Sequence, residues 1–427
     1  MPKVLVITYY WPPAGGPGVQ RWLSFTRYLP EFGFQPLVFI PDNPHYPIKD
    51  ESLLSEVPAD LAIYRQKIFE PYSLAKVWLG NKTDTISSGI IRQESQSWSE
   101  RFMLWIRGNL FIPDARKFWI RPACKKILEI IKKEEIETLI TTGPPHSLHL
   151  IGLEVSRKTG VKWIADFRDP WTSIGYHSKL KLGSAAQKKH IRLEKEVLNS
   201  ADKIITTSRT TRDEFSRITS KPITVITNGF EDSMAKENLP LDQTFSLSFI
   251  GSLLSGRNPT NLWKAISELI SENKQFREYI NIKIVGLVSE DVLERIYHYG
   301  LKDHTTIIPY VSHKEAQEYQ RSSQVLLLLE IDRAECKGII PGKLFEYMSA
   351  KRPILAIGPA DWEAGLIVET TKSGVYFGYE SHQELKTQIL EWYELFRQAK
   401  LHTESDSIAM YSRRSRTEKL AEELKWE

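Results

Sequence analysis

Two residues that can do chemistry lie close together in the stretch PGKLFEYMSAKRPILAIG, residues 341–358. The pattern predicts a helix that starts near Gly342, after an apolar strand and a loop. Lys343 falls in the first turn of that helix, where its ammonium group can meet a phosphate. Glu346 follows three residues later on roughly the same face, and its carboxylate can accept both hydroxyl groups of a ribose. The alternative is a Lys/Glu pair on a solvated helix face, which the apolar surroundings disfavour.

Two glycine-rich loops can bring the backbone close to a ligand of the same kind. The first is TYYWPPAGGPGVQRW, residues 8–22, and the second is GSLLSGRNPTN, residues 251–261. Glycines such as Gly16 and Gly251 allow positive φ and a close approach, and the helix that follows offers free N–H groups to an anion. In the second loop, the planar guanidinium of Arg257 can pair with a phosphate. The alternatives are tight strand-to-helix turns and a solvated arginine.

Further reactive groups follow two predicted strands of the first half. TTGPPHSLH places His146 directly after one strand, and ADFRDPW places Asp166, Arg168 and Asp169 at the end of another. Ligands bind where the carboxyl ends of parallel strands meet, so His146 is a candidate contact to the reacting group and either carboxylate can position a hydroxyl. The alternatives are a structural histidine and an Arg168–carboxylate pair, because charges beside an apolar strand need partners. His149 is expected to pack on its helix.

These loops need strands and helices to hold them, and the sequence contains both in alternation. Runs of consecutive apolar residues, typical of strands buried on both faces, are separated by amphipathic stretches. Such alternation predicts βαβ units, and the number of runs fits two doubly wound parallel sheets better than one. The fold class expected is therefore α/β, with two Rossmann-like domains that face each other across a cleft. The runs are residues 4–8, 36–40, 138–142, 162–167, 203–208, 223–228, 245–251, 281–286, 305–309, 324–330 and 353–358.

A polar stretch without periodicity, NGFEDSMAKENLPLDQT at residues 228–244, marks the expected boundary between the domains. We expect an N-terminal domain over residues 1–235, with a basic and aromatic insertion near 70–125. The C-terminal domain is expected over residues 236–405. Residues 406–427 are predicted to form a charged terminal helix that packs back toward the N-terminal domain.

Composition limits the class of protein. A chain of 427 residues with 41% hydrophobic and 26% charged content predicts two globular domains. Its net charge of +4, from 57 basic and 53 acidic residues, gives no sign of a nucleic-acid partner. Cys124 and Cys336 cannot form a disulfide framework and lack metal-ligand spacing, which indicates a reducing compartment. No apolar run nears the roughly 20 residues of a membrane span, and no signal-peptide pattern precedes the first strand, so a cytoplasmic protein is expected.

Residues 98–133 combine positive charge with aromatic side chains. They hold nine Lys and Arg against three Asp and Glu, and their aromatic residues include Trp105, Phe118 and Trp119. Trp together with Lys or Arg suits an interface with anionic lipid, so a membrane surface is one possible partner. The other interpretation is a helical excursion that packs on the first domain and leaves a basic face in water.

Four stretches, which follow one another along the chain in the same order as the family's motifs, resemble the family 4 glycosyltransferases. PGKLFEYMSAKRPILAIG is similar to their donor-site helix and the strand after it, and VITNGF at residues 225–230 resembles their segment near the domain boundary. The loops at residues 8–22 and 251–261 extend the likeness over nearly the whole chain. The resemblance implies the two-Rossmann GT-B fold and a nucleotide-diphosphate sugar donor held mainly by the C-terminal domain. It also implies retention of anomeric configuration, with no divalent metal and no cofactor.

The resemblance also implies roles for single residues. Glu346 would bind the ribose, Lys343 and Arg257 the diphosphate, and His146 would lie near the transferring sugar. The residues expected to bind the donor are Gly16, Gly251, Ser252, Arg257, Gly342, Lys343, Leu344 and Glu346. The expected catalytic residues are His146, Asp166 and Asp169.

Two points stay open. Many members of the family carry a second glutamate eight residues before the ribose-binding one, and Gly338 stands there in this chain, which leaves the identity of the sugar undetermined. Arg21, at the end of the opening loop, can either face the cleft or pair with a carboxylate on its own helix.

Taken together, these features predict a retaining hexosyl- or N-acetylhexosaminyltransferase that acts on a saccharide or lipid-linked saccharide. Surface polysaccharide biosynthesis, such as that of lipopolysaccharide, is the expected setting, in the cytoplasm or peripherally at the inner membrane. The alternatives are a nucleotide-sugar epimerase of the same fold and a nucleotide-binding scaffold without turnover. A nicotinamide oxidoreductase is disfavoured, because the opening loop lacks the spacing of the dinucleotide fingerprint.

Overall fold

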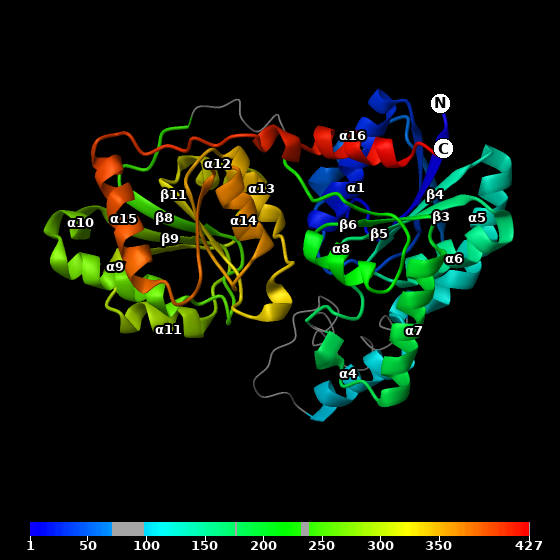
Figure 1. The fold of residues 1–427 in the computed structure, drawn as a ribbon, viewed down its shortest axis with the longest axis horizontal. Coiled ribbons are helices and arrows are strands. Elements are labelled where there is room, and N and C mark those ends of the chain that lie inside the picture. Colours follow the sequence, from blue (N-terminus) through cyan, green and yellow to red (C-terminus); the bar gives the residue numbers. More distant parts are fainter. Residues whose placement is uncertain (71–97, 176, 232–238, 427) are drawn as a thin grey trace. The chain divides into compact units, whose positions relative to one another are not determined.

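The computed structural model describes residues 1–70, 98–175, 177–231 and 239–426 (Figure 1). Contacts divide the chain into two compact units: unit 1 is Met1–Asn228 with Arg413–Glu427, and unit 2 is Gly229–Ser412. The first part of the predicted insertion near residues 70–125 lies outside the described residues. Within the described ranges, no helix combines the length and the apolar character that crossing a bilayer requires.

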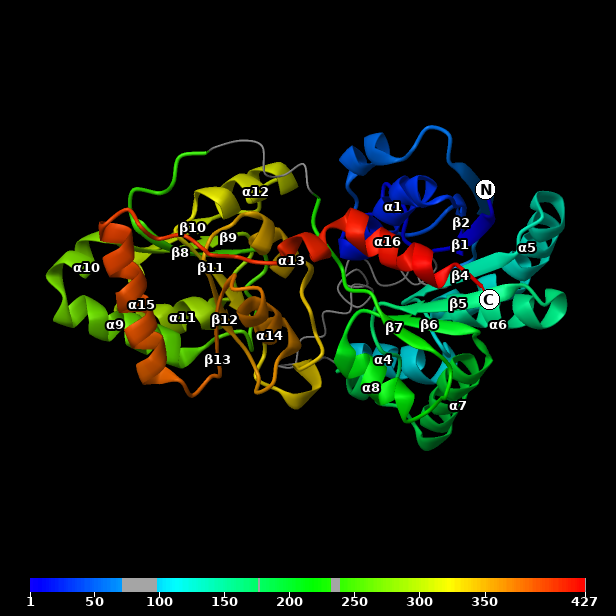
Figure 2. The ribbon, with the colours of Figure 1, turned by 45° about the horizontal axis from the view of Figure 1, so that its top comes forward.

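Unit 1 is built on a seven-stranded parallel sheet with the order β3-β2-β1-β4-β5-β6-β7 (Figure 2). The strand order reverses beside β1, and in such sheets ligands bind outside the carboxyl ends of the strands at this point. The strands are β1 (Lys3–Ile7), β2 (Gln35–Pro41), β3 (Ala62–Gln66), β4 (Thr138–Gly143), β5 (Lys162–Phe167), β6 (Lys203–Thr206) and β7 (Ile223–Val225). The helices are α1 (Pro17–Tyr28), α4 (Trp98–Leu110), α5 (Ile120–Glu134), α6 (Ser147–Thr159), α7 (Ser184–Ser200), α8 (Arg209–Ser216) and α16 (Arg413–Glu423). Short 3₁₀ turns are η1 (Leu29–Phe32), η2 (Glu51–Glu56), η4 (Ala115–Trp119) and η5 (His177–Leu180).

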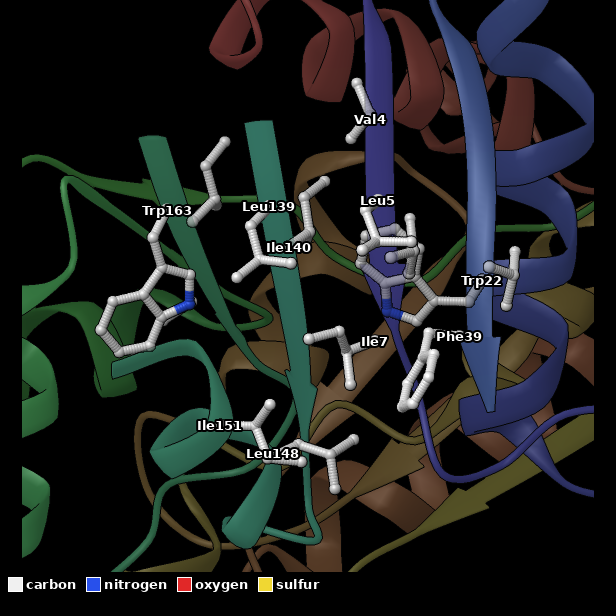
Figure 3. Close-up of a cluster of buried hydrophobic side chains, with 14 of the residues drawn as sticks. Val4, Leu5, Ile7, Trp22, Phe39, Leu139, Ile140, Leu148, Ile151 and Trp163 are labelled. Atoms are coloured by element: carbon white, nitrogen blue, oxygen red, sulfur yellow. The ribbon is translucent and has the colours of Figure 1, made fainter. Parts of the chain in front are cut away.

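The central strands of unit 1 are apolar along their whole length because helices cover both faces of the sheet. Figure 3 shows side chains of β1 and β4 packed with Leu148 and Ile151 of α6. At Gly152 of α6, a Cβ would collide with the indole of Trp163 on β5. The absence of a side chain at Gly152 therefore lets α6 lie close to the sheet, which fixes the start of α6 at the carboxyl edge of β4.

Helix α16 belongs to unit 1 although it follows unit 2 in the sequence, and both ribbon views show it beside α1 (Figures 1 and 2). Arg414 Nε lies 2.8 Å from Glu31 Oε2, and Arg413 donates to the side chain of Gln20 at 2.8 Å. Beyond the helix, Trp426 Nε1 donates to Thr138 Oγ1 on β4 at 2.9 Å. The last residues of the chain thus anchor on the central sheet of unit 1.

Unit 2 is a six-stranded parallel sheet with the order β10-β9-β8-β11-β12-β13, with a separate apolar cluster on each face. The two doubly wound parallel sheets predicted from the sequence are therefore confirmed. The strands are β8 (Phe245–Ile250), β9 (Ile280–Val285), β10 (Thr305–Ile308), β11 (Val325–Leu329), β12 (Ile354–Ile357) and β13 (Gly374–Phe377). The helices are α9 (Thr260–Glu272), α10 (Lys274–Tyr279), α11 (Glu290–His298), α12 (His313–Ser322), α13 (Gly342–Ser349), α14 (Glu363–Thr370) and α15 (His382–Arg397), with 3₁₀ turns η7 (Lys302–His304), η8 (Ala334–Cys336) and η9 (Ile408–Tyr411).

Candidate functional site

The end of β8 and the start of α13 meet through the side chain of Lys343. Its Nζ donates to the carbonyl of Ile250 at 3.1 Å and lies 4.0 Å from the ring centroid of Phe249. Gly251 has φ 124°, and a Cβ there would come within 2.9 Å of Lys343 Nζ. The predicted glycine at this position therefore makes room for the lysine as well as for the turn.

Arg257 of the same loop forms a two-point ion pair with Glu330, the residue directly after β11. Arg257 Nε lies 3.1 Å from Glu330 Oε1, and Nη2 lies 3.2 Å from Oε2. The carboxylate is buried, whereas the arginine side chain keeps 31% of its surface exposed. Tyr379 supports the pair by donating its hydroxyl to the carbonyl of Glu330 at 2.8 Å. This geometry excludes the alternative of a freely solvated Arg257.

The charged side chains around Lys343 affect its pKa. Burial of Lys343, with a further effect of the Arg257 guanidinium, lowers the lysine pKa to about 7, although Glu330 and Glu346 oppose the shift. A lysine with this pKa sits close to its charge transition at neutral pH. An anion placed between Lys343 and Arg257 would favour the charged form, so the pair has the electrostatic character of an anion site.

Glu346 lies one turn further along α13 and is held from α12. Gln320 Nε2 donates to Glu346 Oε2 at 3.0 Å, and His313 Nε2 lies 3.9 Å from Oε1. The glutamate side chain keeps 18% of its surface exposed, so a ligand can still reach it.

The other residues of unit 2 that were predicted to bind the donor differ in which of their groups can contact a ligand. Gly342 is the first residue of α13, whose start carries no side-chain cap, and such a start attracts anions. The side chain of Leu344 is fully buried in the core and its N–H donates to the carbonyl of Pro341, so only its remaining main chain can face a ligand. Ser252 is exposed in the loop after β8.

In unit 1, the buried carboxylate of Asp166 is bonded by three other side chains. Its Oδ1 lies 3.0 Å from Arg21 Nη2, while Oδ2 accepts from Trp22 Nε1 at 2.9 Å and from Thr142 Oγ1 at 2.8 Å. Arg21 also donates to the carbonyl of Thr227 at 2.9 Å. This arrangement corrects the expectation that Arg21 would face the cleft or pair on its own helix, because its partner is Asp166 on β5. With all three donors around it, Asp166 serves the structure of unit 1, and a role in positioning an acceptor remains a prediction that we test below.

Arg168 and Asp169 differ from Asp166 in their surroundings. Arg168 donates to the carbonyls of Gly143 and Pro144. Among the described residues it forms no ion pair with a carboxylate, so the structure does not contain the Arg168–carboxylate pair considered as the alternative. A Cβ on Gly18 would collide with the Arg168 guanidinium. Gly18, in the first turn of α1, therefore leaves space for the arginine that follows β5, and Gly16, with φ 103°, forms the turn into α1. Asp169 is exposed beside them.

His146 lies at the expected strand end but below the surface. Its side chain is 4% exposed and stacks on Trp171 with ring centroids 4.8 Å apart. Neither ring nitrogen has a hydrogen-bond partner among the described residues. Burial, aided by His149, lowers the pKa of His146 well below its ordinary value, so the ring is neutral at neutral pH. His149, expected to pack on its own helix, stacks instead on Phe167 of β5 and forms a hydrogen bond with Thr141 of β4.

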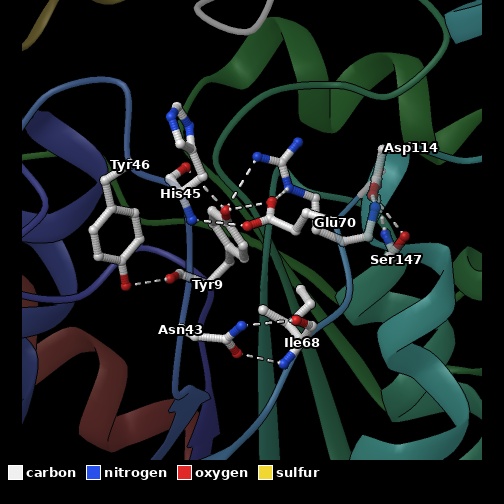
Figure 4. Close-up of polar contacts among 9 residues, drawn as sticks. Tyr9, Asn43, His45, Tyr46, Ile68, Glu70, Asp114 and Ser147 are labelled. Atoms are coloured by element: carbon white, nitrogen blue, oxygen red, sulfur yellow. Dashed lines mark hydrogen bonds and ion pairs between the residues drawn. The ribbon is translucent and has the colours of Figure 1, made fainter. Parts of the chain in front are cut away.

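A polar network beside the opening loop involves residues that the sequence did not single out (Figure 4). The Tyr9 hydroxyl donates to Glu70 Oε1 at 2.7 Å, and Arg116 Nε lies 3.2 Å from the same oxygen. Arg116 also stacks over the Tyr9 ring at 4.5 Å. Nearby, Asp114 accepts from the backbone and hydroxyl of Ser147 and so holds the start of α6. No local pattern marks these residues, because their partners lie far apart in the sequence.

The basic and aromatic residues 98–133 divide into buried and exposed members. Trp119 is fully buried and stacks on Phe39 at 5.4 Å, so it belongs to the core and cannot touch a membrane. Trp105 and Phe118 keep 43% and 44% of their surface exposed. Lys117 Nζ lies 5.0 Å over the Phe118 ring. Part of the segment therefore packs on unit 1, and part of it remains a cationic and aromatic surface.

Two family models match the sequence: Glycosyltransferase Family 4 over residues 92–233, and Glycosyl transferases group 1 over residues 230–405. A search of curated proteins finds no match. Among solved structures, HepE from Anabaena in complex with UDP is similar with a TM-score of 0.63 and 13% identity over 99% of each chain. Sucrose-phosphate synthase from Thermosynechococcus elongatus has a TM-score of 0.57 and 14% identity over 99% of this chain and 97% of its own. WaaG, a glycosyltransferase involved in lipopolysaccharide biosynthesis, has a TM-score of 0.54 and 11% identity over 99% of this chain and 100% of its own.

Proposed function

This chain belongs to the family 4 type of glycosyltransferases with the GT-B fold, and from this premise we propose that it is a retaining enzyme. The donor is a nucleotide-diphosphate sugar, and the acceptor is a saccharide or a lipid-linked saccharide of surface polysaccharide biosynthesis. The enzyme works in the cytoplasm or peripherally at the inner membrane, without a metal ion.

The convergence of Lys343, Arg257 and Glu346 in unit 2 carries the donor proposal. The Arg257 guanidinium contributes to the lowered pKa of Lys343, and Nη1 of Arg257 lies outside its ion pair with Glu330. These two cations bind the diphosphate, and the Glu346 carboxylate accepts the ribose hydroxyls. HepE, a similar structure, is described in complex with UDP, which supports a nucleotide ligand for this fold.

The proposed reaction is a front-face displacement. The acceptor oxygen forms a bond to the anomeric carbon on the side from which the donor phosphate leaves, and the departing phosphate oxygen takes the acceptor proton. Such a reaction needs no protein nucleophile, so the protein acts by orienting the two substrates and stabilising charge on the diphosphate. Lys343 and Arg257 supply that stabilisation, and the uncapped start of α13 adds to it.

A panel of UDP, GDP, ADP and dTDP tests the donor site by thermal shift, since ligands that bind the folded state stabilise it. We expect one of the four to raise the melting temperature, and the matching nucleotide sugars to be hydrolysed or transferred in the presence of EDTA.

Lys343→Met and Glu346→Gln should each weaken nucleotide binding by about 1.5–3 kcal/mol, the scale of a lost charge-assisted contact. Lys264→Met, an exposed lysine of α9, is the matched control. Unchanged nucleotide affinity in both the Lys343 and the Glu346 variant would show that the donor does not bind at the start of α13.

The lowered pKa of Lys343 predicts proton uptake when the diphosphate binds. At pH 8 a lysine with a pKa of about 7 is mostly neutral, and a bound phosphate raises that pKa by favouring the charged form. Binding should therefore take up close to one proton at pH 8, measured by calorimetry in buffers with different ionisation enthalpies. Lys343→Met should abolish this uptake. Equal uptake in the two proteins would assign the proton to another group.

We propose further that the exposed part of residues 98–133 meets anionic lipid near the acceptor. Phe69, Leu110 and Phe118 are each about half exposed, and Phe69 and Phe118 touch at a centroid distance of 5.8 Å. Lys117 lies over the rings of Phe111 and Phe118, so the surface pairs an ammonium group with aromatic side chains, as lipid interfaces favour.

Replacing Trp105 and Phe118 together by Ser should weaken co-sedimentation with phosphatidylglycerol vesicles by about fivefold or more, because two interfacial aromatic side chains are lost. Salt should weaken binding of the unmodified protein as well. Tyr297→Ser is the control, since Tyr297 of unit 2 also lies exposed beside a lysine, Lys302. Unchanged sedimentation of the double variant would leave this surface without a lipid partner.

A further inference from the structure

Gln320 of α12 is buried and has one polar contact that matters for the donor site. Its side chain is 3% exposed, and its Nε2 donates to Glu346 Oε2 at 3.0 Å. Its Oε1 is buried and has no hydrogen-bond partner among the described residues. The amide is thus oriented by Glu346 alone, because only the NH₂ end can satisfy a carboxylate.

Hydrogen bonds at both ends of helix α12 hold Gln320 in place beside Glu346. At the start, Ser312 and Glu315 form a reciprocal capping box. At the end, Ser323 bonds the hydroxyl of Ser248 on β8 at 2.7 Å, and Arg352 donates to the carbonyl of Ser323 at 2.8 Å. The helix therefore carries the amide to a defined place relative to α13.

We propose that Gln320 is a positioning residue that orients the Glu346 carboxylate for the two ribose hydroxyls of the nucleotide. This inference rests on the proposed function, in which Glu346 binds the ribose. A vicinal diol needs two acceptor positions in a fixed plane, and a hydrogen bond to Oε2 fixes the rotation of the carboxylate about its last bond. Among the described residues Oε1 accepts no hydrogen bond, and His313 Nε2 lies 3.9 Å from it, so Oε1 stays open to a ligand.

The residue type at position 320 fits this task. A lysine or arginine would neutralise Glu346 and occupy the lone pairs that the ribose needs. A carboxylate at this distance would repel Glu346 and raise the pKa of one of the two. An amide donates one hydrogen bond and leaves the negative charge of Glu346 intact.

Binding of three probes separates positioning from general damage: UDP, 2′,3′-dideoxyuridine 5′-diphosphate and pyrophosphate. For the unmodified protein we expect UDP to bind more tightly than the dideoxy nucleotide. Gln320→Leu should weaken the affinity for UDP by about tenfold, the scale of a hydrogen bond to a charged group. The affinities for the other two probes should change by no more than about twofold. In a Glu346→Gln background the same change should have little further effect, because the carboxylate it positions is gone. Gln388→Leu is the matched control, since Gln388 bonds an exposed glutamate, Glu391, on α15.

Each outcome decides a separate point. If the unmodified protein binds UDP but does not prefer it over the dideoxy nucleotide, the ribose role of Glu346 fails and this inference fails with it. If the preference exists and Gln320→Leu keeps it, or weakens all three probes equally, only the positioning role fails. Gln320→Met, which refills the site with a flexible side chain, replaces the Leu variant if that variant does not fold, and the same three affinities then decide.

Discussion

Replacing Asp166 by Ala should unfold unit 1 instead of slowing transfer in a folded enzyme. Asp166 is fully buried, and its carboxylate is the acceptor for Arg21, Trp22 and Thr142. Removing one partner of a buried ion pair leaves an uncompensated charge, and such changes cost about 3–5 kcal/mol. The Arg21 side chain is only 2% exposed, so water cannot take the place of the lost carboxylate.

Calorimetry can separate this effect from catalysis, because the chain folds as two units with separate cores. We expect the Ala variant to lose or strongly lower one thermal transition, while unit 2 keeps its own transition and its nucleotide binding. Asp169→Ala is the control for stability, since Asp169 is exposed just after β5, the strand that carries Asp166, and its loss should leave both transitions in place. An Asp166→Ala protein with normal stability and no turnover would contradict the structural role and favour the predicted catalytic one.

The interior strands could be predicted from the sequence because a strand buried on both faces is apolar at every position. All eleven apolar runs correspond to strands; nine of these are interior, and two, β7 and β10, lie at sheet edges. Two strands at sheet edges were not predicted. β3 is only partly buried and contains Arg65, and β13 begins with a glycine and is partly buried throughout, so neither has the composition of an interior strand.

Residues of the candidate site were predictable where their spacing is local. Lys343 and Glu346 are three residues apart on one helix, and the structure places them at the start of α13 as expected. Glu330 was not predicted as a partner of Arg257, although an acid directly after the apolar run 325–329 was a usable signal. The pairing itself joins residues 73 positions apart, and it depends on the order of β8 and β11 in the sheet.

The same reasoning explains why the sequence left both a ligand role and a structural role open for Asp166 and Trp119. A charge at a strand end and a tryptophan in a basic segment are each compatible with a ligand or with the core. The choice depends on a distant partner: Arg21 lies 145 positions from Asp166, and Phe39 of β2 stacks on Trp119. Local patterns do not contain that information, because it arises only when the sheet assembles.

Replacing His146 by Phe should lower the rate constant for transfer by about 10²-fold, the scale of one positioned polar group, with nucleotide affinity nearly unchanged. We propose this role because a buried imidazole with two unpartnered nitrogens needs a polar partner, and a sugar hydroxyl can supply one. The neutral ring would donate or accept a hydrogen bond without transferring a proton, since its pKa is lowered well below the usual value. Both nitrogens lie below the surface, so side chains over them must move when the substrate binds.

Phe is the informative substitution because it can keep the stack on Trp171 while removing both nitrogens. The melting temperature of unit 1 should therefore stay close to that of the unmodified protein. His177→Phe is the matched control: His177 also lies buried with an unpartnered Nε2, packs against His190, and has no predicted contact to substrate. A rate loss confined to His146→Phe, with UDP affinity retained, marks an interaction made mainly in the transition state. A stable His146→Phe protein with full turnover would make His146 a packing residue and remove it from the active site.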